Sequence, residues 1–230
     1  NRTTASLSSA TFIGSQAGEA GSVTTGARNT NTFVGAQAGQ NPSQTTANMS
    51  QNTGIGNNAL KQQLKTTGGS YFNTAVGVDA LAMDSTTTQT TNNNTAVGRG
   101  TLGTNKTGTD NVAIGAYALD ANTTASYNTA IGYNALTANT TGADNTAIGA
   151  SALDACTTGS NNTAGGGNAL GALTTGGQNT AFGKGAGDAI TTASHNTAIG
   201  SHSLGTNTTG QYNVAVGREA LFGNTTASNN

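Results

Sequence analysis

Residues Asn128 to Leu136 read NTAIGYNAL, and seventeen residues further on, from Asn145, the chain reads NTAIGASAL. The motif recurs along almost the whole chain of 230 residues. Its first residue falls at 21-residue intervals and then at 17-residue intervals, at Ala10, Asn31, Asn52, Asn73, Asn94, Asn111, Asn128, Asn145, Asn162, Asn179, Asn196 and Asn213. Self-similarity at a fixed short period indicates a repeat architecture in which each unit stacks on the one before.

The repeat has a small set of fixed positions. The glycine four residues after the start is present in all twelve units, the residue before it is Ile or Val in ten, and Leu closes the motif in nine. In two neighbouring units these positions are Asn128, Ala130, Ile131, Gly132 and Leu136, then Asn145, Ile148, Gly149 and Leu153. The four extra residues of the longer units lie outside the motif, where a stacked repeat tolerates loop insertions.

These boundaries predict one continuous domain over residues 10–230. It divides into 21-residue coils over residues 10–93 and 17-residue coils over residues 94–230. The chain starts NRTTASLSS, without an initiator methionine or a signal-peptide pattern. We therefore expect residues 1–9 to be a lead-in from a longer chain.

Composition excludes several classes of protein. Hydrophobic residues make up 33% and charged residues 7%, against a usual charged fraction of about 25%, so a conventional close-packed core is not expected. A net charge of -1 and a single proline argue against ordinary disorder. The eight Lys and Arg residues are scattered, which predicts no nucleic-acid binding. No apolar run approaches the roughly 18 residues that a membrane span needs.

The unit is too short and too rich in Gly, Thr and Asn to form a helix pair. Two short extended segments, around TAIG and AL, fit it better. The predicted fold is therefore all-β: a parallel β-solenoid of about twelve coils. Aligned asparagines should form an amide ladder along the axis, and the glycine should take a positive φ or a crowded corner.

Strand alternation places Ala130 and Ile131 on opposite faces. We expect Ile131 and Leu136 to fill a thin interior. The alanine column from Ala75 to Ala215, with Phe12 and Phe33, would then face outward as an apolar stripe. Such a stripe favours symmetric self-association.

The N-T-A-I/V-G-x-x-A-L unit resembles repeats of phage tail-fibre proteins and of the head domains of trimeric autotransporter adhesins. The resemblance covers residues 10–230. It implies a left-handed parallel β-roll whose three chains pack as an intertwined or side-by-side homotrimer. The coils of 17 or 21 residues are longer than the adhesin unit of about 14, and the NTTG connectors are closer to the tail-fibre repeats.

Candidate chemical sites are few. Asp120, Asp154 and Asp188 share one column in every second coil, about 10 Å apart, and are interpreted as solvated turn residues rather than the paired carboxylates of a glycosidase. The stretch FGKGAG from Phe182 to Gly187 lacks the Ser or Thr of a phosphate-binding loop. His195 and His202 have no further ligands at a useful spacing, so no metal site is predicted. Cys156 cannot form an internal disulfide and is interpreted as a packing residue.

Two kinds of binding surface remain open. Stacked Thr-Thr steps, as in Thr140 and Thr141, could form an ice-binding array, although adjacent threonines point to opposite faces and satisfaction of turn backbone is the simpler role. Receptor or glycan binding would use variable aromatic residues and long connectors. These are Tyr117, Tyr133, Phe222 and residues 61–72.

The sequence thus predicts a non-enzymatic structural or adhesive segment of an extracellular fibre, on a phage virion or a bacterial surface. Its expected partners are its own copies in a homotrimer and a cell-surface glycan or protein receptor. We expect no cofactor, no nucleic acid and no membrane insertion of this segment. The alternative is a monomeric β-solenoid with an ice-binding, glycan-binding or glycan-cleaving face.

Overall fold

A computed structural model of the chain describes residues 10–19, 30–40, 49–61, 70–82 and 91–230. The expected lead-in over residues 1–9 lies outside this part. All the regular elements of the described residues are short strands. They are β1 (Thr11–Ile13), β2 (Thr32–Val34), β3 (Met49–Ser50), β4 (Thr53–Ile55), β5 (Ser70–Tyr71), β6 (Thr74–Val76), β7 (Thr95–Val97), β8 (Val112–Ile114), β9 (Thr129–Ile131), β10 (Thr146–Ile148), β11 (Thr163–Gly165), β12 (Thr180–Phe182), β13 (Thr197–Ile199) and β14 (Val214–Val216).

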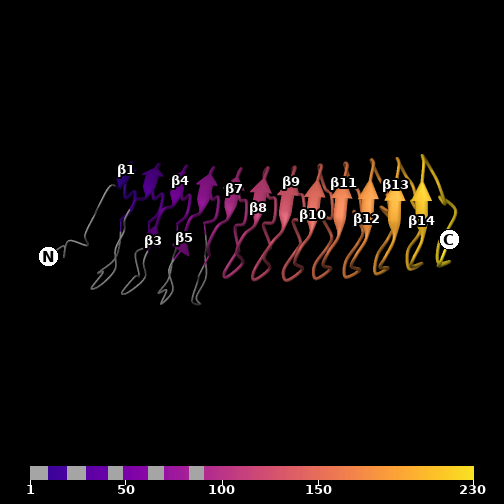
Figure 1. Cartoon of the computed structure of the whole chain (residues 1–230). Coiled ribbons are helices and arrows are strands. Elements are labelled where there is room, and N and C mark those ends of the chain that lie inside the picture. The colour runs from indigo at the N-terminus through magenta and orange to yellow at the C-terminus, as the bar shows by residue number, and fades with distance from the viewer. Residues whose placement is uncertain (1–9, 20–29, 41–48, 62–69, 83–90) are drawn as a thin grey trace.

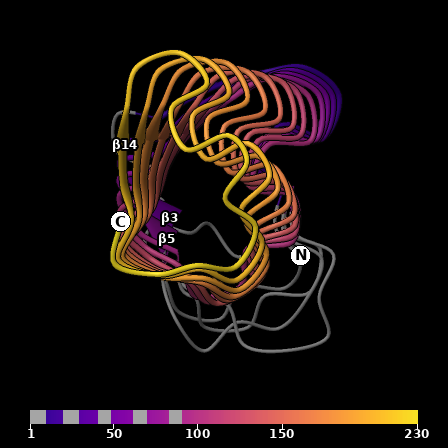
Figure 2. The same cartoon turned by 90° about the vertical axis from the view of Figure 1, so that its right-hand side faces the viewer.

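The chain is a parallel β-solenoid, as predicted. Twelve of the strands form one sheet in which each strand pairs with the equivalent strand of the next coil, and β3 and β5 form a second, two-stranded sheet. Pairing is in register, with Thr146 opposite Thr129 and Ala147 opposite Ala130. Figure 1 shows the strands side by side along the rod, and Figure 2 shows the coils superposed down the axis with the long sheet on one side.

The asparagine ladder predicted from the sequence is confirmed. Asn128 accepts a hydrogen bond at Oδ1 from the backbone N–H of Asn145, 3.0 Å away, and its Nδ2 donates to the carbonyl oxygen of Gly142 at 3.0 Å. The side chain of Asn111 holds Asn128 in the same way, at 3.0 Å. Because Asn128 is fully buried, water cannot replace these bonds, and each asparagine fixes the position of the next coil.

The repeat glycine is confirmed as a position that only glycine fits. Gly132 has a φ of 142°, a region that L side chains rarely adopt. A β-carbon built there would overlap the carbonyl oxygen of Gly149, the same residue of the next coil. The glycines of neighbouring coils therefore stack backbone against backbone.

The expected orientation of the strand is wrong. Ala130 is fully buried and belongs to the core, whereas Ile131 is only half-buried and Ile148 is 46% exposed. The same holds at the first coils, where Phe33 is fully buried and Phe12 packs against the core. The interior thus consists mainly of the alanine column and the leucines, with single residues such as Met49, Cys156 and Ile190, and the Ile/Val column faces outward.

The coil cross-section explains this orientation, because the space inside each coil is shared by the alanine position and the leucine position. In the first two coils Phe replaces the alanine and Gly replaces the leucine. A β-carbon at Gly18 would meet the ring of Phe12 at 2.8 Å, and one at Gly39 would overlap the ring of Phe33. One large side chain thus occupies the space that Ala and Leu fill together in the other coils. An isoleucine at the alanine position would not fit in a coil that also holds the leucine.

The AL segment is a turn rather than the second strand that the sequence analysis expected. Leu136 has a left-handed φ of 54°, which costs on the order of 1 kcal/mol for a side chain of this kind. Its side chain is fully buried, and its N–H donates to the carbonyl of Ala152 at 2.9 Å. Burying a leucine contributes roughly 2 kcal/mol, so packing offsets the strain.

Substituting Gly132 by alanine should destabilise the rod on the order of 3 kcal/mol, because it combines a positive φ with a backbone overlap. Gly167→Ala is the matched control, since the nearest atom to a β-carbon there is 3.8 Å away. Urea unfolding followed by circular dichroism measures both. Equal midpoints for the two variants would contradict the glycine stack.

Substituting Asn128 by alanine should cost on the order of 2 kcal/mol, because the buried N–H of Asn145 loses its acceptor. Thr124→Ala, at an exposed position of the preceding connector, should change stability by less than about 0.5 kcal/mol. Thermal melts of the two variants make the comparison. The ladder would be refuted as a source of stability if Asn128→Ala melted with the parent.

Candidate association surface

The outer face of the twelve-stranded sheet is uncharged and partly apolar. In every one of its strands the first and third residues point outward and the middle residue inward. The first is Thr in ten strands and Val in β8 and β14. We call the column of third residues the apolar stripe: Ile13, Val34, Ile55, Val76, Val97, Ile114, Ile131, Ile148, Gly165, Phe182, Ile199 and Val216.

The apolar stripe stays continuous where the repeat departs from Ile or Val. Gly165 leaves a gap in β11, and the ring of Phe182 in β12 lies over it, because a β-carbon at Gly165 would overlap that ring. Phe182 is itself 47% exposed. A large side chain therefore restores the apolar surface that the glycine lacks. Soluble monomers seldom expose a contiguous apolar patch of this length.

Two further columns border the outer face. The leading corner is the residue just before the ladder asparagine in each coil, such as Tyr127, and all twelve have a left-handed φ. They are Thr30, Gln51, Phe72, Asn93, Asp110, Tyr127, Asp144, Asn161, Gln178, His195, Tyr212 and Asn229 in the coils that begin at residue 31 and beyond. The trailing corner is the residue just after the repeat glycine, such as Tyr133. Both columns vary from coil to coil and include charged residues, whereas the stripe between them is Ile or Val in ten of its twelve strands.

The variable aromatic residues form small surface clusters. The guanidinium of Arg99 lies over the ring of Tyr117, 5.4 Å from its centre, and Tyr117 meets Tyr133 edge-on at 6.4 Å between ring centres. At the leading corner His195 stacks on Tyr212 at 4.7 Å. The sequence analysis named Tyr117 and Tyr133 but not Tyr127 or Tyr212, which are both more than half exposed.

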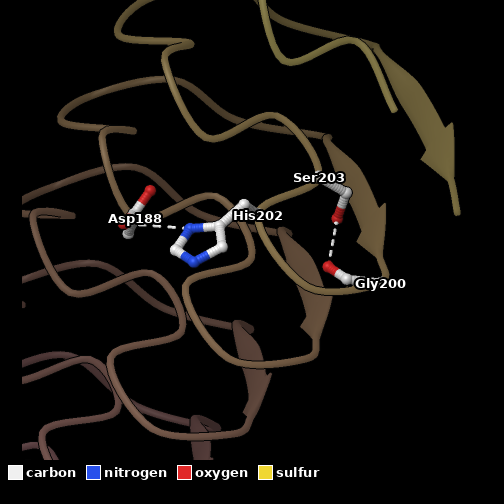
Figure 3. A network of polar contacts seen from close by, with 4 residues as sticks. All are labelled: Asp188, Gly200, His202 and Ser203. Atoms are coloured by element: carbon white, nitrogen blue, oxygen red, sulfur yellow. Dashed lines mark hydrogen bonds and ion pairs between the residues drawn. The ribbon is translucent and has the colours of Figure 1, made fainter. Parts of the chain in front are cut away.

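The aspartates that share one column are turn residues, as interpreted, but Asp120 and Asp154 are not freely solvated. Burial raises the pKa of the Asp120 carboxyl. Burial also raises the pKa of the Asp154 carboxyl, and this effect is larger than that of the hydrogen bond from Ser151, which lowers the pKa. Figure 3 shows Asp188 facing His202 of the next coil, with 4.0 Å between Oδ2 and Nδ1. Ser203 beside it closes its own turn by donating to the Gly200 carbonyl at 2.9 Å.

The structure assigns backbone roles to the Thr-Thr steps. The first threonine donates to the equivalent threonine carbonyl of the next coil, as Thr140 does to Thr157 at 3.0 Å. The second, as Thr141, is exposed. From Thr123 to Thr209, each Thr-Thr step thus presents one exposed threonine, as expected, rather than a Thr-x-Thr pair.

The remaining candidates lie within the repeat. FGKGAG contains β12's Phe182 and the repeat glycine Gly183, whose backbone stacks on Gly200. Cys156 is fully buried in the core, and burial raises the pKa of its thiol to about 11. Most of the connector 61–72 lies outside the described residues, and Phe222 is 45% exposed in the last coil.

Among the described residues, no group of three or more His, Cys, Asp or Glu side chains is placed to hold a metal ion. The part of the chain that the structure describes also contains no helix that could cross a bilayer. Comparison of the chain with known protein families, curated proteins and solved structures finds no match.

Replacing Asp120 by asparagine should stabilise the rod at pH 7 and leave its stability unchanged at pH 3. The folded pKa is raised, so stability is fully present below the unfolded pKa and is lost as pH rises through the folded pKa. The neutral amide avoids that loss. Asp144→Asn, at an exposed position, controls for removal of one negative charge. Melting temperatures of both variants at the two pH values test this, and a gain at pH 3 equal to that at pH 7 would contradict it.

Proposed function

We propose that this chain is a structural segment of an extracellular fibre, which self-associates through the apolar stripe as a homotrimer. The observation that carries the proposal is the outer face of the sheet. Its twelve strands present Thr, Ile, Val, Phe and Gly outward and no charged residue, although both neighbouring corners carry charges. A face kept apolar over twelve coils fits burial against another copy of itself.

The orientation of the strand residues also supports self-association. The sequence analysis expected an outward stripe of alanines, but the outward side chains are Ile and Val, such as Ile148 and Val216, which is 67% exposed. These side chains remove more apolar area from water than alanine would on association. The interior of each coil holds mainly Ala and Leu and is thin, so burying the stripe would supply a second core.

A stiff rod is the mechanical part of the proposal. Backbone hydrogen bonds join the coils, the asparagine ladder adds to them from Asn31 onward, and twelve coils at the strand spacing give a length of about 55 to 60 Å. Three such rods side by side form a spacer that can project a binding surface. The threefold assembly and the placement on a phage tail fibre or a bacterial surface adhesin rest on the resemblance of the NTAIGxxAL repeat to those families.

A receptor would bind the surface positions that differ from coil to coil. Glycan or protein recognition on this fibre would use aromatic residues that project from the corners, such as Tyr133, which is 57% exposed. The alternative of a monomeric solenoid with an ice-binding or glycan-active face requires the stripe to remain in water.

Light scattering on a size-exclusion column tests the proposal. The parent should have a mass near three times 22.5 kDa. Ile148→Asp should reduce it towards the monomer mass while the ladder keeps the coil folded, because a charge in a buried apolar interface is costly. Thr141→Asp adds the same charge at an exposed connector position outside the strand and should leave the mass unchanged.

A folded parent of 22.5 kDa would overturn self-association and favour the monomeric alternative. Thermal hysteresis and release of reducing sugar from polysaccharides would then separate its ice-binding and glycan-cleaving versions.

A further inference from the structure

A second surface feature lies just beyond the trailing corner, at the residue two positions after the repeat glycine. We call this the turn position, and it has a left-handed φ in all twelve coils. Glycine occupies it in two coils only, at Gly100 and Gly185. A ring occupies it in two coils only, at Tyr117 and His202, and each of these coils directly follows a glycine coil. Glycine and ring therefore occur together, twice along the rod.

Both rings lie against the glycine of the preceding coil. A β-carbon built at Gly100 would be 3.1 Å from the ring of Tyr117. One built at Gly185 would be 2.7 Å from the ring of His202. The glycine thus provides the space in which the ring lies, and two parts of the rod repeat one local arrangement.

An unpaired cation precedes each of the two glycines. Arg99 and Lys184 are both exposed, and within the described part of the chain neither side chain forms an ion pair or a hydrogen bond. The guanidinium of Arg99 lies over the ring of Tyr117. The trailing corner has one other cation, Arg218, and it pairs with Glu219 at 2.8 Å. Filling the space over a glycine needs a ring but no cation, so packing alone does not explain the arrangement.

A carboxylate lies beside each ring. Asp120 is three residues after Tyr117, and its Oδ1 would be 2.6 Å from a β-carbon at Gly103, in the same preceding coil that the ring covers. Asp188 Oδ2 faces His202 Nδ1 at 4.0 Å, as Figure 3 shows. We call the two groups the ring clusters. The first consists of Arg99, Tyr117 and Asp120, and the second of Lys184, Asp188 and His202.

The chemistry of a ring cluster suits a neutral sugar. The apolar C–H face of a pyranose can pack on the ring. Its hydroxyl groups can accept from the guanidinium or ammonium group and donate to the carboxylate. Each cluster has one positive and one negative side chain when the histidine is neutral, so its charge favours neither a polyanion nor a polycation.

We propose that the two ring clusters bind a neutral glycan. This inference rests on the proposed receptor contact of the fibre, and it names the site and the class of ligand. The clusters lie in the turns that follow the strands and not on the outer face of the sheet. Burial of the apolar stripe between copies therefore does not require the clusters to be covered.

The spacing of the clusters favours a glycan chain over a single sugar. Both occupy the same column of the rod, five coils apart, which is about 24 Å at the strand spacing. A chain that is bound at one cluster can reach the other along the rod. The second contact is then intramolecular and raises the overall affinity.

Affinity electrophoresis of the full chain tests the inference. Native gels contain dextran, galactomannan, arabinoxylan or alginate, and migration is compared with that in a gel without polysaccharide. The first three polysaccharides are neutral or nearly so, and alginate is a polyuronate. The parent should be retarded by at least one of the three neutral polysaccharides and not by alginate.

The double variant Tyr117→Ser with His202→Ser should lose this retardation. Serine is the natural residue of the turn position at Ser151, so the coil can accommodate it, and circular dichroism confirms that the variant is folded. Each single variant should bind about 100-fold more weakly than the parent, because one cluster alone lacks the avidity of two. Asn134→Ser with Asn168→Ser changes the same column without removing a ring and should bind as the parent does.

Retardation of the parent by alginate alone would overturn the neutral class of ligand. Unchanged migration in every gel would overturn glycan binding by the rod. Equal retardation of the ring variant and its asparagine control would overturn the assignment to the ring clusters. A monomer mass of the parent in light scattering would instead contradict the proposed self-association, so the two failures are distinguishable.

Discussion

The buried asparagine ladder is the interaction on which the rest of the structure depends. The interior of each coil is narrow and holds mainly alanine and leucine. Apolar packing of these small residues does not by itself fix the alignment of one coil on the next, so the alignment comes from polar bonds that water cannot replace. Asn128 and its equivalents supply them by accepting from the next coil's backbone and donating across the coil. With the ladder in place, the glycines stack, the strands pair in register, and every column of side chains runs straight along the rod.

Because the columns run straight along the rod, the direction in which one strand residue points is repeated over the whole surface. Because Ala130 faces the narrow interior, Ile131 must face outward, and the same alternation repeated over twelve strands makes a continuous apolar stripe. The ring of Phe182 over Gly165 shows that this surface keeps its shape where the repeat changes. The thin core and the exposed stripe are therefore two results of one geometry. Each favours assembly with further copies.

Much of this fold could be predicted from the sequence. The repeat period indicates stacked coils, the fixed glycine indicates a positive φ or a crowded corner, and the fixed asparagine indicates a ladder. The orientation of the strand could not be derived from alternation alone, which separates Ala130 from Ile131 without choosing the inner one. The sequence does hold the deciding signal: Phe12 and Phe33 occur where Gly18 and Gly39 replace leucine, so these two positions share a space. The left-handed leucines and the corner residues Tyr127 and Tyr212 had no comparable signal, since their role depends on the path of the coil.

Hydrogen exchange of protein labelled with ¹⁵N-asparagine, followed by NMR, tests the ladder most directly. The account predicts that the side-chain amides of the buried asparagines, such as Asn128 and Asn145, exchange far more slowly than the side-chain amide of an exposed asparagine such as Asn161. Side-chain amides are the informative probes, because strand pairing alone would protect only the backbone. Exchange of the Asn128 and Asn145 side-chain amides as fast as that of Asn161 would contradict the claim that buried asparagines hold the coils together.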